Sequence, residues 1–225
     1  MMSFRILKGK IVDEYFSKKA GNLDSFEVKV IENITKVIQT VSNVKFYLLD
    51  HFLFQIKSDD EMSVNGLTEI GWYYSSLETG FYQLSTNHLY NLFSPKCEKQ
   101  VSIDYILGQL IENAKMKRIQ NILNDEIKIK KLEHLKDDFY DLTTKSYIDK
   151  IKILRDGNTA HNDVNYNEPQ IIKIKEVYEL FYKANNNLLE VLSILELETD
   201  ALTKIIGKQF LYEIDAYLKK NNIFK

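Results

Sequence analysis

The chain has 225 residues, of which 44% are hydrophobic and 28% charged, but only 8 are glycine and 2 are proline. Average usage would give about 16 Gly and about 11 Pro in a chain of this length. Because Gly and Pro mark turns, their scarcity indicates few turns and long elements, and it argues against a β-sandwich or barrel. The nucleotide-binding signatures GxGxxG and GxxxxGK[ST] are both absent. The composition therefore favours an all-α protein.

Charge and cysteine content exclude further classes. Thirty basic and 32 acidic residues leave a net charge of −2, so no overall basic field attracts nucleic acid. A single cysteine, Cys97, excludes an internal disulfide and a cysteine-based zinc site. The N-terminus does not have the pattern of a signal peptide, and the most apolar stretch, residues 46–56, is too short to cross a bilayer. We therefore expect a cytoplasmic protein with no membrane contact, no metal and no other cofactor.

Two long helices are predicted in the first half of the chain, because apolar residues recur there every three or four positions. The first helix ends near Lys57, where Ser58, Asp59 and Asp60 offer turn residues. The second stops before Ser94 because Pro95 disfavours helical geometry in the residue that precedes it. The first stripe contains Leu23, Phe26, Val30, Ile34, Val37, Val41, Val44, Leu48 and Phe52, and the second contains Leu67, Ile70, Tyr74, Leu77, Phe81, Leu84, His88 and Leu92.

The second half of the chain predicts further helices. Ser102 is a typical N-cap for a third helix, which carries Ile103, Leu107, Leu110 and Ala114. A fourth run contains Leu132, Leu135, Phe139 and Leu142 and continues to Leu154, and whether it joins the third helix near residues 121–125 stays open. Pro169 fits the first position of a helix that carries Val177, Phe181, Ala184, Leu188, Val191 and Leu195. Thr199 or Asp200 would cap a last helix with Leu202, Ile206, Phe210, Ile214 and Leu218.

The predicted fold is an up-and-down bundle of five to six long helices, since short connections between long helices favour antiparallel neighbours. No repeat or Gly/Ser-rich linker divides the chain. Residues 21–225 are therefore predicted to form a single helical domain, and residues 1–20 an arm or short helix.

One polar stretch, Arg155-Asp156-Gly157-Asn158-Thr159-Ala160-His161-Asn162-Asp163, interrupts the helical pattern. Gly157 suits the residue that ends a helix at Asp156, and Arg155 in the last turn would face the negative end of the helix dipole. A capped helix and a polar loop account for both residues, but they leave His161 unexplained.

The same stretch resembles the R-x(4–6)-H motif of the HEPN superfamily, with five residues between Arg155 and His161. RDGNTAHND is most similar to the RDK-x-x-AH-x-D pattern of the abortive-infection branch, with Gly157 in place of the usual lysine. The aromatic segment from Trp72 to Phe93, followed by Ser102 and Ile103, is similar to the second and third helices of that branch. The resemblance implies a HEPN-like helical bundle.

The resemblance also implies a metal-independent endoribonuclease that acts as a homodimer, a toxin in phage defence or a toxin–antitoxin system, with a possible antitoxin or neighbouring regulatory protein. In such a reaction the RNA 2′-OH attacks the adjacent phosphate, giving a 2′,3′-cyclic phosphate and a 5′-OH. His161 would serve as acid or base because histidine titrates near neutral pH, and the Arg155 guanidinium would bind the crowded phosphorane. Asp156, Asn158, Asn162 and Asp163 are candidates for supporting or RNA-binding roles.

Other interpretations stay open. The chain could instead be a non-catalytic helical module that binds RNA or a protein, or a purely structural or regulatory bundle. Residues 115–136 contain seven Lys or Arg and three acids, which indicates either a phosphate-facing strip or a solvated helix face. His88 lies on an apolar stripe and is interpreted as a core histidine.

Overall fold

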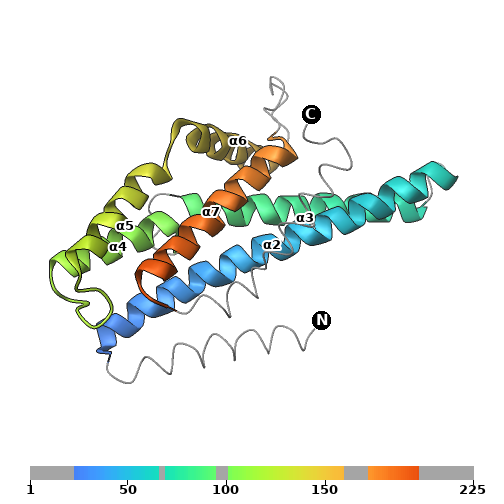
Figure 1. The fold of residues 1–225 in the computed structure, drawn as a ribbon. Helices are drawn as coiled ribbons and strands as arrows, with labels where there is room; N and C mark the ends of the chain where they lie inside the picture. Colours follow the sequence, from blue (N-terminus) through green and yellow to red (C-terminus); the bar gives the residue numbers. More distant parts are fainter. Residues whose placement is uncertain (1–22, 66–68, 95–100, 160–171, 198–225) are drawn as a thin grey trace.

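The computed structural model describes residues 23–65, 69–94, 101–159 and 172–197, which form six helices and no strand (Figure 1). The helices are α2 (Ser25–Asn65), α3 (Glu69–Phe93), α4 (Ile103–Lys115), α5 (Glu126–Phe139), α6 (Leu142–Thr159) and α7 (Ile174–Ile194). The predicted all-α bundle is confirmed.

The helices α2 and α3 form a long hairpin that extends beyond the other helices (Figure 1). The predicted stripe of α2 is buried from Val30 to Leu48, but Phe26, at the start of the helix, is 36% exposed. The predicted turn at residues 58–60 is wrong, because α2 runs through it to Asn65. Ser and Asp are weaker helix formers by only a few tenths of a kcal/mol each, which is too little to end a helix that packs along a partner.

The helices α4 and α5 are separate, which answers the question left open by the sequence. Ser102 caps α4 as predicted, and its side chain accepts a hydrogen bond from the Tyr105 N–H at 3.1 Å. Asp125 caps α5 and accepts from the Ile127 N–H at 2.7 Å. The fourth predicted run is also divided, since α5 ends at Phe139 and α6 begins at Leu142. Leu142, expected in the core, is 86% exposed.

The helix α7 contacts all five other helices and lies at the centre of the core. All six apolar residues predicted for it, from Val177 to Leu195, are buried. It begins at Ile174, later than predicted, and the two residues before it, Ile172 and Lys173, are not helical. The Glu176 carboxylate accepts a hydrogen bond from the Lys173 N–H at 2.8 Å and so closes the first turn.

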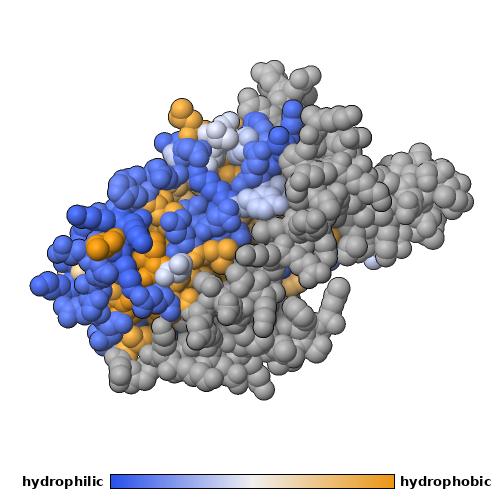
Figure 2. Space-filling model, in the orientation of Figure 1, coloured by the Kyte–Doolittle hydropathy of each residue, from blue (hydrophilic) through white to orange (hydrophobic). Residues whose placement is uncertain are grey.

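Several predictions fall outside the described residues: the arm at residues 1–20, Cys97, Pro169 and the last helix. Figure 2 shows that the described part of the visible face is mostly hydrophilic, with hydrophobic residues in bands and isolated spots between the polar ones. The candidate site lies where α6 meets α3.

Candidate functional site

Ion pairs between α6 and α7 fix the position of α6. Lys150 Nζ lies 2.5 Å from the Glu176 carboxylate, and Lys183 pairs with Asp141 at the start of α6. The hydrogen bond from Lys183, together with the Thr144 N–H, lowers the pKa of Asp141 to about 2. These pairs set the register in which α6 carries its remaining side chains.

Arg155 lies on the inner face of α6. Ile148 and Ile151 are buried, and Arg155 follows Ile151 at a spacing of four, on the same side of the helix. The Arg155 guanidinium carbon lies 4.1 Å from the centroid of the Tyr90 ring on α3, and both side chains are half-buried. A cation held over an aromatic face in this way is positioned by the ring. The structure thus fixes the first predicted catalytic residue against α3.

The predicted helix end at Asp156 is wrong, because α6 continues through Gly157 and Asn158 to Thr159. Glycine in a helix costs about 1 kcal/mol relative to alanine, which a packed helix tolerates. Arg155 is therefore four residues from the end of α6 and not in its last turn. The side chains of Asp156 and Asn158, and residues His161, Asn162 and Asp163 as a whole, lie outside the described part of the structure.

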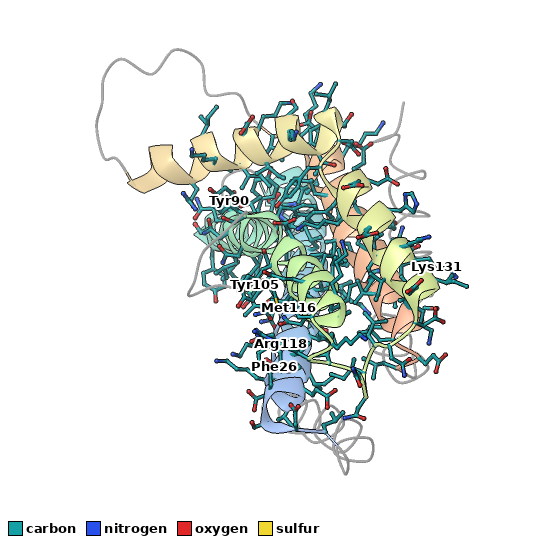
Figure 3. All side chains as sticks on the ribbon, turned by 90° about the vertical axis from the view of Figure 1, so that its left-hand side faces the viewer. Phe26, Tyr90, Tyr105, Met116, Arg118 and Lys131 are labelled. Carbon is teal, nitrogen blue, oxygen red and sulfur yellow. The ribbon has the colours of Figure 1, made fainter. Side chains whose placement is uncertain are left out.

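The basic run at residues 115–136 does not form one strip. Lys115 pairs with Glu133 at 2.5 Å, and Lys128 pairs with Glu196 at 2.6 Å. Figure 3 shows Arg118 near the lower end of the face turned to the viewer and Lys131 well to its right, on α5. The cations are thus divided between the end of α4 with the turn that follows it and α5, where Lys136 lines the groove against α4.

Two other histidines are packed between α2 and α3. His51 Nδ1 lies 3.2 Å from the Glu78 carbonyl oxygen, and burial lowers the pKa of its imidazole. The His88 ring stacks on Tyr47 with 5.4 Å between centroids, and burial lowers its pKa as well. This packing agrees with the interpretation of His88 as a core histidine.

A groove of about 640 Å³ separates α4 from α5. Its lining carries both signs of charge, and it consists of Gly108, Ile111, Glu112, Lys115, Glu133, His134, Lys136 and Asp137. A Cβ added at Gly108 would come within 3.2 Å of Lys136 Nζ, so the glycine makes room for that ammonium group. Within the described ranges, no group of three or more His, Cys, Asp or Glu side chains is arranged to hold a metal ion.

Comparisons of the chain with protein-family models, with curated proteins and with solved structures find no match. None of the described helices combines the length and apolar character needed to cross a membrane.

Two features of the surface were missed by sequence reasoning. Tyr90 was noted only as part of an aromatic helix, and nothing in the local sequence links it to Arg155. The exposed side chains of Tyr105 and Met116 were not singled out, and Phe26, at the start of α2, was assigned to the core. Both features depend on how helices distant in sequence pack together.

Proposed function

We propose that the chain is a metal-independent endoribonuclease of the HEPN type, in which Arg155 and His161 act together on the RNA backbone. The observation that carries the proposal is the half-buried Arg155 side chain, held over the Tyr90 ring near the end of α6. A guanidinium that is already held in place loses less side-chain entropy when it binds a phosphate. The residues that complete the motif follow directly along the chain.

The spacing of the motif supports the pairing of Arg155 with His161. Four of the six steps from Arg155 to His161 lie in α6, which rises about 6 Å over four residues. The remaining two steps add at most about 7.6 Å between Cα atoms. With the reach of both side chains, this distance allows a single phosphate to contact both groups.

In the proposed reaction the RNA 2′-oxygen attacks the adjacent phosphorus and the bond to the 5′-oxygen breaks. His161 would accept the 2′-OH proton or donate a proton to the leaving 5′-oxygen. Arg155 would form paired hydrogen bonds to the phosphorane oxygens, where negative charge develops. Because one copy supplies one histidine, we propose a two-fold dimer in which a second copy supplies the other. Such an activity fits a toxin used in phage defence.

The test is cleavage of a labelled single-stranded RNA, with the product termini identified chemically. We expect a 2′,3′-cyclic phosphate and a 5′-OH, no effect of EDTA, and rates reduced about 10²- to 10⁴-fold by His161→Ala. Arg155→Lys should lose most of the activity despite keeping the charge, because lysine lacks the planar fork. Lys152→Ala is the matched control, since it removes an exposed cation from the same helix.

Equal cleavage by the parent chain and His161→Ala would refute the catalytic proposal. RNA binding without cleavage would favour the non-catalytic module instead. Sedimentation that shows only monomer at micromolar concentration, while cleavage persists, would refute the dimer.

A further inference from the structure

Exposed apolar and basic side chains lie at the start of α4, at its end and in the turn that follows it, and at the start of α2. We call this group the α4 patch and define it as Phe26, Tyr105, Met116, Lys117 and Arg118. Phe26 is 36% exposed, Tyr105 38% and Met116 52%, and both cations are exposed as well. Figure 3, in which α4 runs largely along the line of sight, shows Met116, Arg118 and Phe26 one below another in the view.

Tyr105 is held at the surface by a chain of hydrogen bonds. The Gln109 side-chain amide donates through Nε2 to the Tyr105 hydroxyl at 2.7 Å, and the side-chain amide of the buried Asn33 on α2 donates to Gln109 Oε1 at 3.3 Å. An exposed aromatic ring that is already fixed loses little entropy when another flat group stacks on it. Tyr105 therefore has the properties of a stacking platform.

The turn after α4 presents its cations from a conformation that is unfavourable for lysine. Lys117 has φ of 57°, in the left-handed region where glycine is the usual residue after a helix. The Arg118 N–H donates to the Asn113 carbonyl and the Lys117 N–H to the Ala114 carbonyl, both at 2.9 Å. A glycine would satisfy the same two hydrogen bonds without the strain. The geometry of this turn therefore does not require a lysine at position 117.

The charges of α4 are divided between its two sides. Neither Lys117 nor Arg118 has an ion pair within the described ranges, whereas Lys115 pairs with Glu133 on α5. Of the two acids of α4, Asp104 adds to the rise in the pKa of Tyr140 that burial causes, at the end of α5, whereas Glu112 is exposed on the same side of α4 as Tyr105 and Met116 and also lines the groove against α5. The turn after α4 therefore carries two unneutralised cations, which together with the exposed rings complement a polyanion with exposed flat bases.

We propose that the α4 patch binds a single-stranded segment of RNA, with bases stacked on Tyr105 and Phe26 and phosphates bound by Lys117 and Arg118. Single strands expose the base faces that a duplex hides, and stacking with cations is the usual mode of binding them. The axis of α4 is about 20 Å long, which suits a few nucleotides. Figure 3 labels Tyr90, which holds Arg155, above Tyr105, and the helices that carry these two residues, α3 and α4, are in contact. The inference rests on the proposed ribonuclease function, because this RNA is its substrate.

The test measures fluorescence anisotropy of a labelled single-stranded oligoribonucleotide of mixed sequence. The full chain carries His161→Ala so that the RNA is not cut. Lys117→Gly should raise the midpoint of thermal unfolding, because it removes the left-handed strain, and should still weaken RNA binding and reduce the salt slope by about one. Tyr105→Leu keeps an apolar residue but removes the stacking ring, and should weaken binding about 5- to 100-fold.

Two matched controls change similar side chains elsewhere. Lys131→Gln removes an exposed cation from the far side of α5, and Tyr73→Leu removes a ring that is 62% exposed on α3. Both should change RNA affinity less than about twofold. Unchanged affinity in Lys117→Gly and Tyr105→Leu, or equal losses in the controls, would overturn the proposal. A protein partner that binds the patch while RNA affinity stays unchanged in these variants would overturn it as well.

The outcomes separate this inference from the proposed function. Cleavage that depends on His161, together with RNA binding that ignores the patch, contradicts only the patch. RNA binding that depends on the patch, without cleavage by the parent chain, contradicts only the catalytic proposal.

Discussion

Replacing Glu27 by alanine should lower the free energy of unfolding by about 2–3 kcal/mol. Glu27 is only 1% exposed, and its carboxylate joins the start of α2 to the segment between α4 and α5. One oxygen accepts from the Asn121 N–H at 2.9 Å, and the other accepts from the Asn121 side-chain amide at 2.9 Å and the Asp24 N–H at 3.2 Å. The same contact holds in place the segment that follows the α4 patch.

The magnitude follows from the number and the exposure of these hydrogen bonds. A hydrogen bond to a charged group contributes about 1.5–3 kcal/mol when a buried partner would otherwise be left unpaired. Asn121 is exposed, so water replaces part of the loss, and the total stays well below three times that value. For a chain of this size, a loss of 2–3 kcal/mol lowers the melting temperature by about 4–12 °C.

The assay is urea unfolding followed by far-ultraviolet circular dichroism, with a double-mutant cycle between Glu27→Ala and Asn121→Ala. The midpoint should fall without a change in the m-value, and the coupling energy should be at least about 1 kcal/mol. Glu32→Ala, an exposed acid on the same helix, is the control and should change stability by less than about 0.5 kcal/mol. A loss below about 0.5 kcal/mol for Glu27→Ala, or a coupling energy of zero, would refute the reasoning.

Three further predictions concern the core, pH and the candidate motif. Phe139 is fully buried and stacks on a second core ring at 4.9 Å, so Phe139→Ala should cost about 3–5 kcal/mol in urea unfolding. Because burial lowers the pKa of His88, the unfolded chain binds more protons than the folded chain below pH about 6.5; stability should therefore fall between pH 7.5 and 5.5, and His88→Phe should flatten that fall. Gly157 is helical, so Gly157→Ala should raise stability by up to about 1 kcal/mol; a loss would instead indicate the helix end predicted from sequence.

The elements that could be predicted from the sequence are those in which local chemistry and core packing agree. The stripe of α7 is buried as predicted, and Ser102 caps α4 as its hydroxyl suggested. The break between α5 and α6 also has a local signal that was overlooked, since the Asp141 side chain accepts from the Thr144 N–H at 2.7 Å and caps α6. Because a new helix begins after Asp141, Leu142 does not continue the core-facing stripe of α5 and is exposed.

The errors at helix ends share a physical cause. Asp59 and Gly157 are poor helix formers, yet α2 and α6 both continue through them. Local propensity amounts to less than about 1 kcal/mol at each position, whereas packing along a neighbouring helix acts over many residues at once. Phe26 is a different case, because its spacing fits the stripe but none of the described helices fully covers it at the start of α2.

The pairing of Arg155 with Tyr90 could not be predicted from either local sequence. It depends on the register of α6 against α3, which is set by the burial of Ile148 and Ile151 and by the ion pair of Lys150 with α7. A shift of one residue in that register would rotate Arg155 by about 100° around the helix axis and away from the ring. Residues that contact no RNA thus determine where the proposed phosphate-binding group lies.

The continuation of α6 to Thr159 changes what holds the motif together. If the helix ended at Asp156, as the sequence suggested, the position of His161 relative to Arg155 would depend on a loop of several residues with many conformations. In the structure α6 covers four of the six steps from Arg155 to His161. Fixing each residue of a loop costs about 1–2 kcal/mol in backbone entropy, so holding these four steps in a helix reduces the cost of bringing the two groups to one phosphate. Gly157 in place of the lysine found in similar motifs is therefore compatible with the proposed chemistry, because the helix rather than the side chain at that position sets the geometry.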